Sequence, residues 1–188
     1  MRITDLLDKR SISLDAVCAS KSDALDQAVA LMVKSGKIND EEAYRKQVYL
    51  REEESTTGIG EGIAIPHGKC DAVSKPGLAA MVIKDGVDFD SLDDEPVNLL
   101  FLIAAPNTED NIHLDVLSKL SMLLMDENFV ENLKNASSVD EFLQIVDAAD
   151  EEKPDLNDQL AAQTETEGAV CKIIAVTSCP TGIAHTYM

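Results

Sequence analysis

Apolar residues recur at the spacing of an α-helix in four segments of the chain. They predict helices over residues 22–36, 40–51, 108–125 and 138–146. Ser22 and Asp40 stand where N-cap residues are expected, and Ser138-Val139-Asp140-Glu141 has the form of a capping box. The third segment has the strongest pattern, with Ile112, Val116, Leu117, Leu120, Leu123 and Leu124 on one face.

Two shorter apolar runs predict strands, at residues 78–83 and 97–104. Both are rich in β-branched residues, and the second is apolar at nearly every position, which is typical of a strand buried on both faces. Asp85-Gly86 and the run from Asp93 to Pro96 are turn signals between them. Helices and strands intermix, so residues 1–146 predict a single α/β domain.

The composition changes after this domain. Residues 147–169 contain eight acidic side chains and little apolar content, which predicts an acidic flexible linker. Residues 170–177 then have a strand pattern, followed by a loop from Ser178 to Thr186. The nineteen residues from 170 to 188 are too few to bury a core, so we expect only the first strand and loop of a truncated second α/β domain.

The net charge is -19, which argues against a surface for nucleic acids or anionic membranes, because either needs a basic patch. No apolar run approaches the roughly 20 residues that cross a bilayer, and the N-terminus lacks a signal-peptide core. Cysteines occur at 18, 70, 171 and 179, without metal-site spacing. We therefore expect a cytoplasmic protein with reduced thiols, no structural disulfide and no metal.

One histidine stands in an unusual setting, the segment Gly60-Glu61-Gly62-Ile63-Ala64-Ile65-Pro66-His67-Gly68-Lys69. Four glycines fall between residues 58 and 68, so the backbone turns tightly there, and Pro66 biases Ile65 towards an extended conformation. This predicts His67 on a stiff loop, where a neutral imidazole can act as a nucleophile near pH 7. The alternative is a loop histidine without a chemical role.

A second candidate lies near the C-terminal end, in Ser178-Cys179-Pro180-Thr181-Gly182-Ile183-Ala184-His185-Thr186. A cysteine between a strand and a helix meets converging backbone N–H groups, which lower a thiol pKa and bind phosphate. The spacing from Cys179 to His185 resembles the phosphate loop of low-molecular-weight tyrosine phosphatases, although His185 replaces their arginine. This favours reversible phosphorylation of the Cys179 thiol, with a buried structural cysteine as the alternative.

The two motifs together resemble a fructose-specific component of the bacterial sugar phosphotransferase system (PTS). Residues 1–146 resemble its enzyme IIA domain of type 2, and residues 170–188 resemble the start of its enzyme IIB domain. The resemblance implies a mixed β-sheet flanked by helices. It also implies that His67 accepts a phosphoryl group from the phosphocarrier protein HPr and that Cys179 receives it next. IIB would then phosphorylate the sugar that passes through the membrane domain IIC, with no cofactor.

The resemblance adds two further site residues. Arg51 matches an arginine near the phosphohistidine, where forked donors can stabilise a transferring phosphoryl group. Without the family, a helix-terminal arginine that complements the dipole or pairs with Glu52 to Glu54 is equally good. His113 lies in the first turn of the third helix on its apolar side, where a neutral imidazole could hold the phosphoryl group or orient His67. Its alternative is a half-buried structural histidine.

Other functions stay open at this point. A nitrogen-type regulatory IIA protein would accept phosphate without feeding a sugar, and a mannitol-type IIA domain would serve another sugar. An acid-rich interaction module would leave His67 unphosphorylated. A zinc hydrolase is the weakest alternative, because no two histidines lie near each other in the sequence and no H-E-x-x-H motif occurs.

Overall fold

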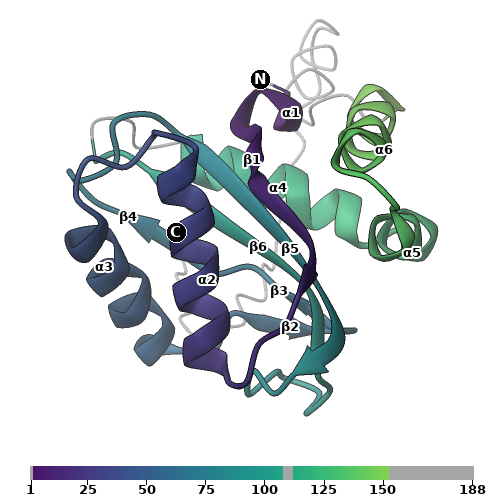
Figure 1. Cartoon of the computed structure of the whole chain (residues 1–188), viewed down its shortest axis with the longest axis horizontal. Helices are drawn as coiled ribbons and strands as arrows, with labels where there is room; N and C mark the ends of the chain where they lie inside the picture. The colour runs from purple at the N-terminus through teal and green to yellow at the C-terminus, as the bar shows by residue number, and fades with distance from the viewer. Residues whose placement is uncertain (1, 108–111, 153–188) are drawn as a thin grey trace, which may run out of the picture. The chain divides into compact units, whose positions relative to one another are not determined.

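A mixed sheet of six strands forms the middle of the domain in the computed structural model, which describes residues 2–107 and 112–152 (Figure 1). The side chains of residues 112–114 and 152 lie outside this description. The strands are β1 (Leu7–Ala16), β2 (Gly58–Gly60), β3 (Ile63–Ala64), β4 (His67–Lys69), β5 (Gly77–Val87) and β6 (Val97–Ala105). Their order is β1-β5-β6-β3-β2, with β4 also paired to β6.

Strand β6 organises this sheet. It runs antiparallel to β5 on one side and parallel to both β3 and β4 on the other. β3 lies opposite Leu99 and Leu100, and β4 lies further along, opposite Ile103 to Ala105. β1 is parallel to β5, and β2 is antiparallel to β3. The predicted fold class, a mixed sheet flanked by helices, is therefore confirmed.

Six helices within the described residues cover the two faces of the sheet (Figure 1). They are α1 (Ile3–Leu6), α2 (Lys21–Lys34), α3 (Glu41–Glu54), α4 (Ile112–Leu124), α5 (Glu127–Asn135) and α6 (Val139–Glu152). α2 and α3 pack on one face, and α1, α4, α5 and α6 lie on the other. None of the helices in the described part of the chain combines the length and apolar character that a membrane span requires.

The side chains of β6 alternate between two apolar cores. Leu99, Phe101 and Ile103 belong to the core beneath α4, α5 and α6, where the Phe101 and Phe142 ring centroids are 6.2 Å apart. Leu100 and Leu102 belong to the core beneath α2 and α3. The prediction that this strand is buried on both faces is therefore confirmed, and the strand is held rigidly between two layers of helices.

The N-caps were predicted with partial success. Asp40 caps α3 as expected, since its side chain accepts from the Ala43 amide. The cap of α2 is Ser20 rather than Ser22, and its hydroxyl accepts from the Asp23 amide. Ser138 accepts from the Glu141 amide at 3.2 Å, but the Glu141 carboxylate binds Ser137 instead of closing the capping box on Ser138.

The expected turn at Asp85-Gly86 is a bulge within β5. The pairing with β6 shifts register between Val82 and Val87, and Gly86 has a φ of 69°, which favours glycine. An Asp-Gly pair can therefore mark a bulge inside a strand as well as a turn between two strands.

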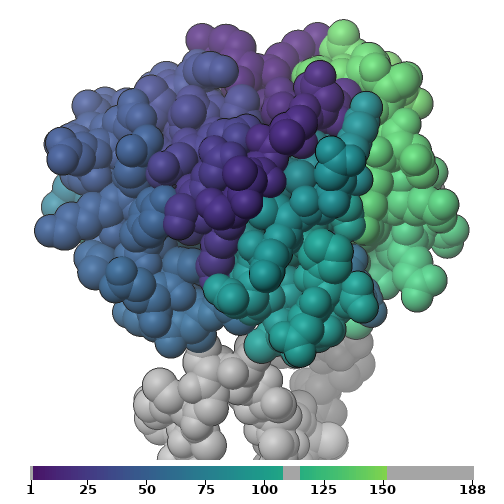
Figure 2. Space-filling view, turned by 60° about the horizontal axis from the view of Figure 1, so that its bottom comes forward, coloured from purple at the N-terminus to yellow at the C-terminus, as the bar shows by residue number. Residues whose placement is uncertain are grey.

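The domain boundary at residue 146 is too early, because α6 continues to Glu152. The acidic side chains of its last turns bind the N-terminal segment rather than only solvent. Asp150 accepts from the Ile3 amide at 2.9 Å and pairs with Lys119 at 2.7 Å, while Asp147 lies 3.3 Å from Arg2. Figure 2 shows the N-terminal residues (purple) against this helix (green). The predicted linker after Glu152 and the domain start at residue 170 lie outside the described residues.

Tyr44 of α3 is fully buried against β4 and β6. Its hydroxyl donates to the Ile103 carbonyl at 3.0 Å. Gly68 lets the two elements approach, since a Cβ there would lie 3.0 Å from both Tyr44 Cε2 and Val48 Cγ2. This contact sets the distance between α3 and the short strand β4.

We expect Tyr44→Phe to lower the free energy of unfolding by about 1–3 kcal/mol, because it strips the Ile103 carbonyl of a buried donor. Tyr49→Phe is the matched control. The Tyr49 hydroxyl lies 3.0 Å from both the Ser22 carbonyl and the Asp26 carboxylate, at a partly exposed position where water can replace it for either acceptor, so we expect a loss below about 1 kcal/mol. Urea unfolding of both variants checks this, and equal losses would contradict it.

Candidate functional site

His67 is the first residue of β4 rather than part of a loop, so that prediction is wrong. It lies opposite Ile103 of β6, whose amide donates to the Pro66 carbonyl at 3.0 Å. The imidazole is half-buried. The extended conformation expected around Pro66 leads directly into this strand, and pairing with a rigid neighbour gives the histidine a defined position.

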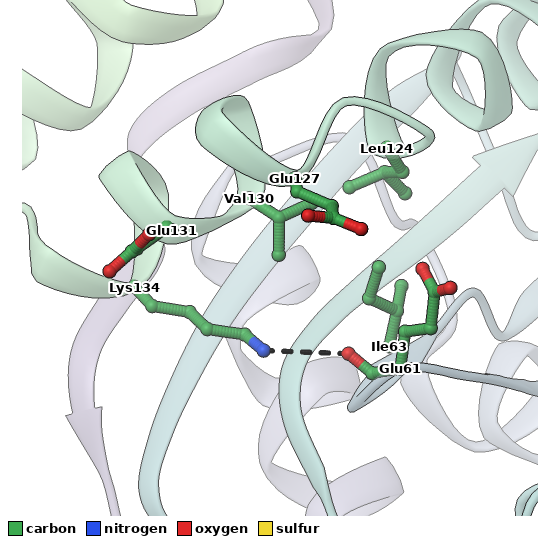
Figure 3. A pocket seen from close by; sticks show the side chains of 7 residues that line it. All are labelled: Glu61, Ile63, Leu124, Glu127, Val130, Glu131 and Lys134. Atoms are coloured by element: carbon green, nitrogen blue, oxygen red, sulfur yellow. Dashed lines mark hydrogen bonds between the residues drawn. The ribbon is translucent and has the colours of Figure 1, made fainter.

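The glycines before His67 serve the reversal between β2 and β3. Gly60, Glu61 and Gly62 have φ values of 101°, 56° and 73°. Two contacts hold this turn. Asp93 accepts from the Glu61 amide at 2.7 Å, and Lys134 of α5 lies 3.5 Å from the Glu61 carbonyl oxygen (Figure 3). A cavity of about 340 Å³ lies between this turn and α5. The glycine cluster therefore shapes a hairpin that leads into the histidine strand.

Arg51 and His67 are brought together, in the arrangement that the family resemblance implied. Arg51 Nε donates to His67 Nε2 at 3.0 Å. A guanidinium has no acceptor, so Nε2 carries a lone pair rather than a proton. The proton of the neutral ring is then on Nδ1, which donates to the Ile65 carbonyl at 3.1 Å. The two contacts together define one tautomer, in which Nε2 is the nucleophilic nitrogen.

The other end of the Arg51 guanidinium is held by Ser55. Nη1 donates to the Ser55 carbonyl at 3.1 Å and to its Oγ at 3.2 Å. Arg51 does lie in the last turn of α3, but its described hydrogen bonds go to Ser55 and His67 and not to the neighbouring glutamates. The pairing of Arg51 with Glu52 to Glu54, one of the alternatives, is therefore not what these contacts support.

A further contact next to this site, at Glu52, was missed in the sequence analysis. Glu52 is buried, and its carboxylate accepts from both the amide and the hydroxyl of Thr57, at 2.9 and 2.5 Å. Lys21 of α2 pairs with it at 2.9 Å. In the sequence, Glu52 is the first of three consecutive glutamates, and its spacing of four from Val48 and eight from Tyr44 is the one signal that puts it on the buried face of α3. Its partners Thr57 and Lys21 are not indicated by any local pattern.

The other two predicted site residues are placed only in part. His113 belongs to the first turn of α4, the helix that follows β6, and its side chain lies outside the described residues. Cys179 lies outside them entirely. The roles predicted for both stay predictions.

Two cysteines are described, and both are free thiols. Burial raises the pKa of Cys18 and of Cys70, so both stay protonated at neutral pH. Within residues 2–107 and 112–152 no group of three histidine, cysteine, aspartate or glutamate side chains has the arrangement of a metal site.

The family described as "Phosphoenolpyruvate-dependent sugar phosphotransferase system, EIIA 2" matches residues 5–149. The chain belongs to this family. A "PTS system fructose-specific EIIABC component" from Bacillus subtilis (strain 168) is 44% identical over 188 residues, which is 100% of this chain and 29% of that protein. The chain thus spans less than a third of the length of this relative.

Two solved structures illustrate the range of the EIIA 2 fold. The nitrogen regulatory protein IIA-Ntr from Neisseria meningitidis superposes with a TM-score of 0.72 and 30% identity, over 77% of this chain and 98% of that one. Enzyme IIAMTL, in complex with phosphorylated enzyme IIBMTL from Escherichia coli, gives a TM-score of 0.66 and 34% identity over 74% and 96%. The same fold therefore occurs in a protein named as a nitrogen regulator and in an enzyme IIA that takes its name from mannitol.

The tautomer of His67 can be tested by ¹⁵N NMR. In the unmodified protein we expect a protonated Nδ1 and an unprotonated Nε2. Arg51→Met removes the donor to Nε2, so the population of the Nε2–H form should rise. Arg45→Met, on the same helix but paired with Glu41 and Asp26, is the control and should leave the His67 signals unchanged. An unaltered tautomer in Arg51→Met would contradict the assignment.

Proposed function

We propose that this chain is a phosphocarrier, in which His67 accepts a phosphoryl group from phospho-HPr and passes it to a cysteine of the IIB domain, Cys179. The single observation that carries this proposal is the hydrogen bond from Arg51 to Nε2 of His67. It supports a nucleophilic nitrogen and a cation at the same point, which are the two groups that phosphoryl transfer between proteins requires.

The transfer begins at His67 Nε2. Its lone pair attacks the phosphorus of phospho-HPr, a new N–P bond forms, and the N–P bond of the donor breaks and returns its electron pair to the donor histidine. Nδ1 keeps its proton and its bond to the Ile65 carbonyl throughout. In the second step the sulfur of Cys179 attacks the same phosphorus. The thiol proton leaves to solvent, and Nε2 regains its lone pair.

Arg51 changes partner during the first step. In the unphosphorylated protein the Arg51 Nε–H donates a hydrogen bond to His67 Nε2, and this bond must break as the phosphoryl group arrives. The planar guanidinium can then donate to the phosphoryl oxygens and stabilise the charge that spreads over them. Ser55 holds its far end, so only a small displacement is needed.

Fructose or a related sugar is the proposed cargo of the complete system. The fructose-specific relative aligns with all 188 residues, including the segment after residue 149 where the EIIA 2 match ends. This favours a sugar carrier over a nitrogen-type regulator and over a mannitol-type domain. HPr, IIB and IIC are the proposed partners, and the charge of -19 would steer the chain in the cytoplasm towards a basic partner surface.

Incubation with enzyme I, HPr and phosphoenolpyruvate should add one acid-labile, alkali-stable phosphate, seen by intact mass and ³¹P NMR. His67→Ala should abolish this gain and keep the fold, because a half-buried imidazole at the start of a short strand contributes little packing. Phosphorylation of the His67→Ala variant, or none of the unmodified protein with active HPr, would refute the proposed function.

His113→Ala should still accept phosphate, but about 10- to 1000-fold more slowly if this imidazole supplies one electrostatic donor to the transferring group. Rapid-quench measurement of His67 phosphorylation checks the rate. Wild-type kinetics in this variant would remove His113 from the site.

A further inference from the structure

The chain reverses direction directly after α3, and Glu52 holds this reversal together. The carboxylate of Glu52 accepts from the Thr57 amide at 2.9 Å and from the Thr57 hydroxyl at 2.5 Å. Its side chain is only 6% exposed. Two donors from one residue, each on a different oxygen, leave the segment from Ser55 to Thr57 little freedom to turn.

Lys21 fixes the carboxylate from the opposite side. Its ammonium lies 2.9 Å from Glu52 Oε1, 3.3 Å from Asp90 and 4.9 Å from the centre of the Phe89 ring. Glu52 is thereby tied to the first residue of α2 and to the loop after β5. The direction of the carboxylate does not depend on α3 alone.

Short chains of hydrogen bonds connect the 55–57 segment to both ring nitrogens of His67. On one side Ser55 binds Arg51, which donates to Nε2. On the other side the Thr57 carbonyl accepts from the Ile65 amide at 3.0 Å, and the Ile65 carbonyl accepts from Nδ1. A shift of the 55–57 segment would therefore disturb both contacts of the ring together.

A gain in folding stability alone does not explain the presence of the Glu52–Lys21 ion pair. A buried ion pair is generally no more stabilising than well-packed apolar side chains of the same size, because burial removes hydration, and here Glu52 at 6% exposure loses more of it than Lys21 at 21%. A carboxylate with three donors does, however, fix the groups around it in one geometry. Supporting contacts of this kind commonly determine how precisely a reactive group is held.

We infer that Glu52 is a positioning residue for phosphoryl transfer, acting through Thr57 and the 55–57 segment on the two described hydrogen bonds of His67, from Arg51 and to Ile65. Lys21 supports it. The inference rests on the proposed function, since it assigns these residues a part in the reaction of His67. It adds Glu52, Lys21 and Thr57 to the groups that hold the site, and these residues act through Arg51 and Ile65.

Two variants test this network of contacts, Thr57→Val and Glu52→Gln, and each has a matched control. Thr57→Val keeps the shape and the amide of Thr57 but removes the hydroxyl bond, whereas Thr57→Ser retains it. Glu52→Gln removes the charge at constant size, and Glu53→Gln, at the exposed neighbouring position, is its matched control. Each variant is made in the full chain and phosphorylated from phospho-HPr under single-turnover conditions.

We expect Thr57→Val and Glu52→Gln to lower the maximal rate of His67 phosphorylation by about 10- to 100-fold, the size of effect that a displacement of about 1 Å produces. The donor concentration for half-maximal rate should stay within about twofold, because the surface that meets HPr is unchanged. The ¹⁵N signals of His67 should show a mixture of tautomers. Thr57→Ser and Glu53→Gln should match the unmodified protein in all three measurements.

A folded Thr57→Val variant with the wild-type rate and the wild-type His67 signals would overturn the inference. If Glu52→Gln fails to fold, the comparison between Thr57→Val and Thr57→Ser still decides it. The ¹⁵N measurement uses unphosphorylated protein, so it tests the positioning of His67 even if the unmodified chain takes no phosphate. That last result would refute the proposed function, and a tautomer mixture in Thr57→Val would still show that the hydroxyl orients the ring.

Discussion

An arginine side chain can only donate hydrogen bonds, and this constraint decides the chemistry of the site. Because Arg51 points its Nε–H at His67 Nε2, that nitrogen must keep its lone pair. The opposite tautomer would set two N–H groups against each other and leave the Ile65 carbonyl without its donor. One guanidinium thus selects the nucleophilic atom and places a positive charge beside it.

The sheet provides the rigidity that such a contact needs. β4 has only three residues, and it is held by β6 on one side and by Tyr44 of α3 above it. β6 is itself packed between two cores, which leaves its side chains little room to shift. Arg51 stands on α3 and His67 on β4, and the Tyr44 contact therefore fixes the separation of the two elements that carry the site.

Much of this arrangement could be predicted where the signal is local. β6, most of α4 and the cap of α3 follow from apolar spacing and from Asp40, and the partnership of Arg51 with His67 followed from family motifs. β2, β3 and β4 were missed, because strands of two or three residues are too short for an alternating pattern. The extension of α6 to Glu152 was missed because its acidic residues are stabilised by groups far away in the sequence, such as Lys119.

The three glutamates that end α3 show most directly why the remaining contacts of the site could not be predicted from the sequence. Glu53 and Glu54 are exposed, whereas Glu52 is buried, although all three have the same side chain and the same helix. Helix spacing places Glu52 on the buried face with Tyr44 and Val48, but its partners come from elsewhere in the fold: the chain after Ser55 returns Thr57 to this carboxylate, and Lys21 comes from another helix. Helix spacing specifies the direction in which a side chain points, whereas the tertiary fold determines which groups it meets in that direction. A charge that looks like an ordinary solvated helix end in the sequence is therefore the residue to which we assign the orientation of the His67 ring.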